Sequence, residues 1–113
     1  MKKKAIIVSL VIMTLVLACG KNPVEPNNNC STPKSYATDV TPIIQSSCAI
    51  NAGCHAIGST NGPGPLTSYA EVFNAKTLIR TAVASGTMPK NSSLSTDQKN
   101  AIICWIDSGA PNN

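Results

Sequence analysis

The chain has 113 residues, enough for one small domain, and carries nine basic and five acidic residues, a formal net charge of +4. Three of the basic residues are the lysines at positions 2–4, so the rest of the chain has six basic and five acidic side chains and is nearly neutral. This balance gives no basis for a nucleic-acid partner or a strongly anionic one. Aromatic residues make up 4% of the chain, so few bulky side chains are present to fill a core.

Residues 1–18 have the pattern of a lipoprotein signal peptide. A basic start is followed by an apolar run from Ala5 to Leu17, which is too short for a comfortable membrane span. The sequence ending in Ala18-Cys19 resembles a bacterial lipobox, which would be cut before Cys19 and carry lipid on that cysteine. A plain signal peptide with Cys19 at the cut is the alternative. Both imply export into an oxidising compartment.

Residues 19–35 are rich in Asn, Pro and Ser and are predicted to form a flexible tether. Cys30 stands out within it, because a tether needs no cysteine. Gly20, with no acidic residue beside it, favours the outer membrane facing the periplasm as the destination. Lipid on Cys19 would then hold the protein at that membrane.

Residues 36–113 are predicted to form one all-α domain with long loops, since no segment alternates between apolar and polar residues as a strand does. The first helix is expected to start near Thr38 or Asp39, with Asp39 as a cap, and to lead into Cys48. Residues 58–65 consist of Gly, Ser, Thr, Asn and Pro and are predicted to be a loop.

Two helical segments are expected next. Ser68 can cap a turn that carries Tyr69, Val72 and Phe73. A separate helix is predicted from about Ala75 to Ala84, and Gly86 lies just beyond its end. One side of this predicted helix carries Leu78, Ile79 and Val83.

The last helix has the clearest signals. Ser95 or Thr96 can cap it, and Gly109 ends it. Its apolar stripe is formed by Ala101, Ile102, Trp105 and Ile106. Trp105 and Ile102 are therefore predicted to be core residues.

The segment from Cys48 to His55 concentrates the reactive side chains. Cys54 directly precedes His55, the one histidine of the chain, and five residues separate Cys48 from Cys54. A cysteine followed at once by histidine, with another cysteine shortly before, is how haem c is attached. Beyond the leader the chain has one methionine, Met88, which precedes Pro89. Histidine and methionine are the axial pair of high-potential cytochromes c, so the pattern predicts one haem.

Other chemistries fit less well. A structural zinc site needs four ligands in paired short spacings, and the adjacent Cys54 and His55 suit a tetrahedron poorly. A blue-copper site needs two histidines. Hydrolytic catalysis lacks an acidic residue placed to orient the histidine. The alternative function is a cofactor-free lipoprotein, stapled by disulfides, that acts as a binding or structural module. Cys48 in particular can either bond haem or pair with Cys30 or Cys104.

The chain from Tyr36 to Asn113 resembles the small single-haem cytochromes c of class I, in a bacterial lipoprotein form. The resemblance rests on the helix that leads into the cysteines, on Cys54-His55, Pro65-Leu66 with Tyr69, Met88-Pro89, and on the closing helix Cys104-Trp105-Ile106-Asp107-Ser108-Gly109-Ala110. The chain departs from the family's C-x-x-C-H motif by three additional residues between the cysteines.

This resemblance implies a helical fold in which the first and last helices cross above the haem. It implies electron transfer to and from redox partner proteins rather than an enzymatic reaction. Carried over by position, Cys48 and Cys54 would form the thioethers to haem c. His55 and Met88 would be the axial ligands of the iron.

The same resemblance leaves two cysteines over. With Cys19 lipidated and haem on the cysteines of the motif, Cys30 and Cys104 would remain to form a disulfide. A bond between Cys48 and Cys104 is the rival pairing, and it implies a single thioether.

Overall fold

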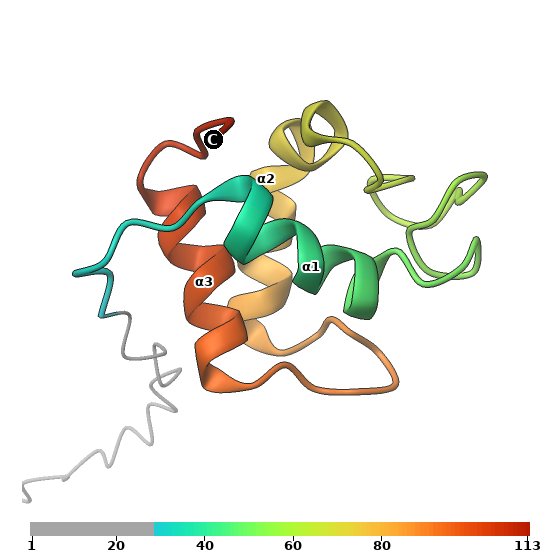
Figure 1. Cartoon of the computed structure of the whole chain (residues 1–113). Helices are drawn as coiled ribbons and strands as arrows, with labels where there is room; N and C mark the ends of the chain where they lie inside the picture. Colours follow the sequence, from blue (N-terminus) through green and yellow to red (C-terminus); the bar gives the residue numbers. More distant parts are fainter. Residues whose placement is uncertain (1–28) are drawn as a thin grey trace, which may run out of the picture.

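The computed structural model describes residues 29–113, which form helical segments joined by long loops, with no strand in this part of the chain (Figure 1). The elements are η1 (Tyr36–Val40), α1 (Thr41–Ile43), η2 (Ile44–Cys48), α2 (Tyr69–Ser85) and α3 (Thr96–Asp107). The predicted all-α class is thus confirmed for these residues. The predicted signal peptide, the lipid site Cys19 and most of the tether lie outside them. None of the helices described here has the length and apolar character needed to cross a membrane.

The first helical segment is formed by η1, α1 and η2 together, and it begins earlier than predicted. Its cap is Ser35, whose hydroxyl accepts a hydrogen bond from the N–H of Thr38. The Asp39 carboxylate in turn accepts one from the N–H of Ser35 at 2.7 Å. The prediction of a start near Thr38 or Asp39 was therefore wrong, because Asp39 stabilises the helix start from inside the first turn.

Helix α2 is one helix where a turn and a separate helix were predicted. It contains neither Gly nor Pro, so nothing in the backbone breaks it after Phe73. Ser68 and Glu71 form a capping box at its start, and Gly86 ends it with a left-handed φ of 71°. Helix α3 begins with the same device, formed by Ser95 and Gln98.

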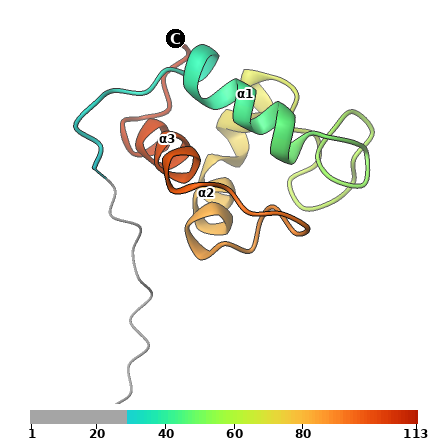
Figure 2. The same ribbon diagram turned by 60° about the horizontal axis from the view of Figure 1, so that its bottom comes forward.

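The core lies where the first helical segment and α2 pack against α3, an arrangement that Figure 2 shows from a second direction. Trp105 and Ile102 are fully buried there, as predicted. The centre of the Tyr36 ring lies 5.3 Å from that of Trp105 and 5.1 Å from that of Tyr69, which it meets edge-on. The Trp105 indole N–H also donates to the carbonyl of Pro111 at 2.9 Å, which fixes the C-terminal segment over the core.

Two side-chain links tie these elements together. Cys30 is joined to Cys104 of α3 by a disulfide, with 5.3 Å between the two Cα atoms. This bond attaches the segment before the first helix to α3. On the surface, Arg80 of α2 makes a two-point ion pair with Asp107 of α3, at 2.6 and 3.0 Å.

Leu78 does not lie on the buried side of α2. Leu78 is 62% exposed, whereas Ile79 and Val83, which the sequence places on the same side of the helix, are buried. The buried positions of α2 follow one another at intervals of three or four residues through Val72, Ala75, Ile79 and Val83, and Leu78 lies beside this stripe. It borders a cavity instead.

Candidate functional site

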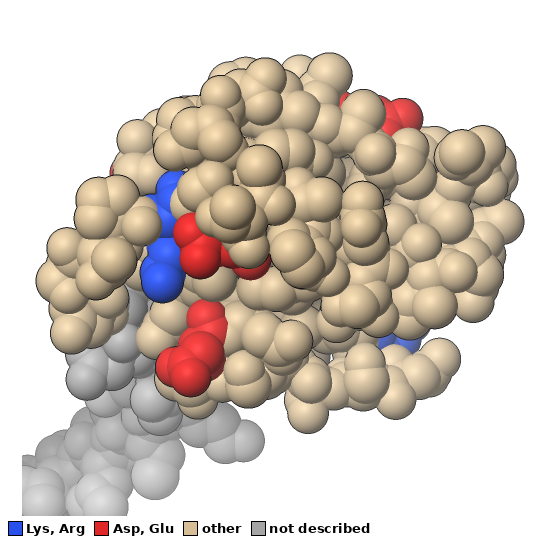
Figure 3. All heavy atoms as spheres, viewed as in Figure 1, with Lys and Arg blue, Asp and Glu red and all other residues tan. Residues whose placement is uncertain are grey.

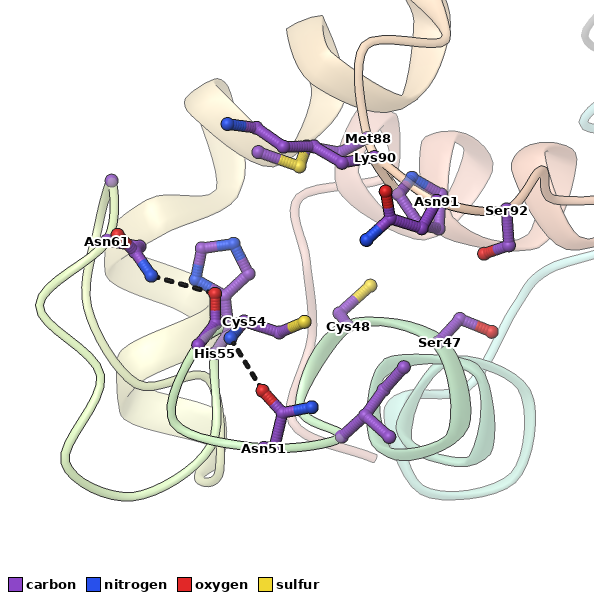
Figure 4. A pocket seen from close by; sticks show the side chains of 14 residues that line it. Ser47, Cys48, Asn51, Cys54, His55, Asn61, Met88, Lys90, Asn91 and Ser92 are labelled. Carbon is purple, nitrogen blue, oxygen red and sulfur yellow. Dashed lines mark hydrogen bonds between the residues drawn. The ribbon is translucent and has the colours of Figure 1, made fainter.

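Four predicted site residues come together around one cavity of 390 Å³, although they lie on three separate segments (Figure 4). Cys48 is the last residue of η2, Cys54 and His55 lie in the following loop, and Met88 lies in the loop after α2. In Figure 4 Met88 approaches the cavity from one side and the two cysteines from the other. The fold therefore gathers the thiols, the imidazole and the thioether into one space.

A second cavity of 260 Å³ adjoins the first, because Cys48, His55 and Met88 line both. The rest of its wall is almost entirely apolar and is formed by Ile44, Gly62, Pro63, Leu66, Leu78, Ile79, Ala82 and Val83. Exposed Leu78 thus borders an apolar hollow rather than open surface. A flat apolar ligand that covered this wall would shield Leu78 from water.

His55 is held in a defined orientation. It is 8% exposed, and its Nδ1 lies 2.9 Å from the carbonyl oxygen of Gly64. Since a carbonyl can only accept, Nδ1 donates this hydrogen bond, which leaves Nε2 as the ring nitrogen that could bind a metal. The carbonyl of His55 also accepts from the N–H of Leu66 at 2.8 Å. An imidazole whose other nitrogen is held by a carbonyl is the usual arrangement of a metal-binding histidine.

Cys48 and Cys54 are both free thiols in the structure, and each is half-buried. Burial raises the pKa of the Cys48 thiol, and a negative charge on Cys54 would raise this pKa further. A thiol with a raised pKa stays protonated and unreactive at neutral pH.

We expect Cys48 to be alkylated more slowly in the folded, haem-free protein than in the same protein in denaturant. The raised pKa of Cys48 lowers the fraction of its thiolate, which is the form that reacts, and burial limits access to the sulfur. Iodoacetamide labelling at mildly alkaline pH, followed by peptide mass mapping, measures the two rates. Equal rates in the folded and denatured states would contradict this account of Cys48.

The surroundings of the cavity carry little charge. No Asp, Glu, Lys or Arg occurs from residue 40 to residue 70, and Lys90 is the single such residue that lines the larger cavity. Exposed apolar side chains lie in the same loop, with Ile50 59% and Ile57 81% exposed. On the face drawn in Figure 3, charged side chains likewise form small separate patches on an uncharged surface. A partner that docks beside the cavity would gain little from charge attraction.

Sequence reasoning did not identify Gly64, Asn51 and Asn61 as parts of the site. Gly64 holds the His55 ring, and the two asparagines bind the backbone around Cys54. The one sequence feature that pointed to an ordered loop here was the repeated Gly-Pro pattern of residues 62–65, because proline restricts the backbone conformation. The predicted disulfide pair Cys30 and Cys104 does not line either cavity.

Comparison with known proteins identifies no relative: no family model, curated protein or solved structure matches the chain.

Proposed function

We propose that this protein is a one-electron carrier with one covalently bound haem c, ligated by His55 and Met88. The observation that carries the proposal is the convergence of the single histidine and the single described methionine on a cavity that also holds two free thiols. The donor set suits haem, because it offers one nitrogen and one sulfur for the two axial positions and two thiols for attachment. The apolar wall suits a porphyrin face.

Each residue has a defined task in this proposal. When bound, the haem supplies one-electron transfer between ferrous and ferric iron. His55 would offer Nε2 to the iron, while the carbonyl of Gly64 keeps the ring oriented. Met88 would supply a soft thioether sulfur to the iron, which favours the reduced state. With protein side chains in both axial positions of the iron, no position would remain for a substrate, and the protein would act as an electron carrier rather than an enzyme.

The apolar wall contributes by keeping water away from the axial ligands. Leu66, Ile79 and Val83 are buried along it, each less than 8% exposed. A low-polarity environment disfavours the ferric form, which carries more charge, and so raises the reduction potential. In the proposed fold the first and last helices cross beside the haem, as in class I cytochromes c.

We further propose that the protein is exported and anchored by lipid on Cys19, at the outer membrane facing the periplasm. Its partners would be redox proteins that reach the cavity side of the domain. The lipid would confine the domain to a membrane surface, since more than one acyl chain gives stable anchoring.

Covalent haem is the direct test of the proposal. We expect the mature protein, made in cells with a cytochrome c maturation system, to stain for haem peroxidase activity on a denaturing gel. The Cys48→Ser/Cys54→Ser variant should run at the same position without staining, because it lacks both attachment thiols. A colourless wild-type band, from cells that mature another cytochrome c normally, would rule out covalent haem and so contradict the proposal.

A further inference from the structure

The loop between the two cysteines is closed at its base. Five residues separate Cys48 from Cys54, yet the N–H of His55 donates to the carbonyl of Cys48 at 3.0 Å. The chain therefore leaves η2 at Cys48 and returns to the same point at His55. The residues between form a loop that can project outward without separating the two ends.

Asn51 fixes the N–H of Cys54 from within this loop. Its backbone carbonyl accepts that N–H at 2.9 Å, and its side-chain oxygen accepts it at 3.1 Å. Gly53 permits this approach, since a Cβ at that position would lie 3.1 Å from the same side-chain oxygen. The Asn51 side chain thus accepts the N–H of Cys54, and the absence of a side chain at Gly53 leaves room for it.

Asn61 fixes the loop from outside. Its side-chain amide donates to the carbonyl of Gly53 at 2.8 Å, from a position eight residues further along the chain. Ser59 donates its hydroxyl to the carbonyl of Cys54. The peptide groups on both sides of Cys54 are therefore hydrogen bonded to side chains.

The result is that both thiols face one space. Cys48 and Cys54 line the same cavity, and Figure 4 shows their sulfur atoms directed into it, with Asn51 on the loop between them and Asn61 on the segment that follows. Ile50, inside the loop, is 59% exposed at the edge of that cavity.

We propose that Asn51 and Asn61 are positioning residues for haem attachment, which hold the five-residue loop so that Cys48 and Cys54 each form a thioether. This inference rests on the proposed function and deepens it, because it assigns two thioethers despite the long spacing. The two asparagines act in opposite senses. Asn51 must accept a hydrogen bond, whereas Asn61 must donate one.

The attachment step balances without any further reactant. In each addition, a thiol S–H bond and the π bond of one vinyl group are lost. A sulfur–carbon bond forms at the vinyl carbon nearer the ring, and the thiol hydrogen ends on the outer carbon. There is no leaving group, and no external oxidant or reductant is consumed. Both cysteines can undergo this step only if both sulfurs reach the two vinyl groups, which is what the loop would ensure.

The test counts the thiols left free in haem-containing molecules. The protein is denatured, alkylated without reductant and analysed by mass spectrometry. Because no reductant is present, the cysteines of the Cys30–Cys104 disulfide are not alkylated. We expect no alkyl group on Cys48 or Cys54 of the wild type. Asn51→Ala and Asn61→Ala should each give a large fraction with one alkyl group, located at Cys48, because Cys54 is adjacent to His55. The pyridine complex of ferrous haem should shift to longer wavelength as one vinyl group remains.

Matched substitutions separate positioning from general damage. Asn51→Asp keeps an acceptor and should behave as wild type, whereas Asn61→Asp loses the donor and should behave as Asn61→Ala. Asn91→Ala changes an asparagine on the far loop of the same cavity and should leave both thioethers intact. An alkyl group on wild-type Cys48, or two thioethers in both alanine variants, would overturn the inference. Wild-type protein with no haem mass would instead refute the proposed function.

Discussion

Met88→Ala is expected to lower the reduction potential by on the order of 0.1 V, within the roughly 0.8 V range that axial ligands control. The physical reason is that a thioether sulfur is a weak donor that stabilises ferrous iron, whereas water or hydroxide in its place favours the ferric form. The ferric variant should also lose the weak long-wavelength absorption band of a histidine–methionine haem. Potentiometric titration followed in the visible spectrum measures both effects.

Two controls make this result specific to the ligand. Met88→His should lower the potential as well but keep the iron six-coordinate, because imidazole is a stronger donor. Leu78→Ala removes an apolar side chain from the same cavity without touching a ligand, so it should keep the long-wavelength band. If the wild type never shows that band, a group other than Met88 fills the position opposite His55.

The helices could be predicted where capping and periodicity agree. Helix α3 has a serine cap, an apolar stripe and Gly109 just beyond its end, and it was predicted within a residue. The start of the first helix was predicted too late because Asp39 was interpreted as the cap, whereas an acidic residue is equally favourable in the first turn of a helix. In the structure Ser35 takes the first role and Asp39 the second.

The site could be predicted as a set of residues but not as a geometry. Cys54-His55 and Met88-Pro89 are recognisable in the sequence because few other residue types can do this chemistry. Cys54 and His55 are held in place by the Asn61 amide and the Gly64 carbonyl, and the positions of these two groups depend on the path of a loop. Loop residues obey no period, so nothing in the sequence indicated which carbonyl would face His55. Helical spacing placed Leu78 on one side of the helix with Ile79 and Val83, but that spacing did not indicate that Leu78 is exposed at a cavity.

Cys30→Ala is expected to lower the free energy of unfolding by roughly 4 kcal/mol, the chain-entropy value for a crosslink of this span. The disulfide joins residues 74 apart in sequence and so restricts most of the unfolded chain. A loss of this size is large beside the roughly 5–15 kcal/mol that stabilises a typical domain. Cys30 is the better partner to replace, because it is exposed. Cys104 keeps its sulfur in the core, so the change removes the crosslink and little packing.

Urea unfolding of haem-loaded protein measures this effect. A second variant, Cys30→Ala/Cys104→Ala, should be less stable than Cys30→Ala alone, since Cys104 is 3% exposed between two fully buried residues and alanine leaves a void there. Ser31→Ala, beside Cys30 on the same exposed segment, should unfold like the wild type. If Cys30→Ala lowered the free energy of unfolding by less than about 1 kcal/mol, the unfolded chain would already be compact without the disulfide. The entropy argument would then be contradicted.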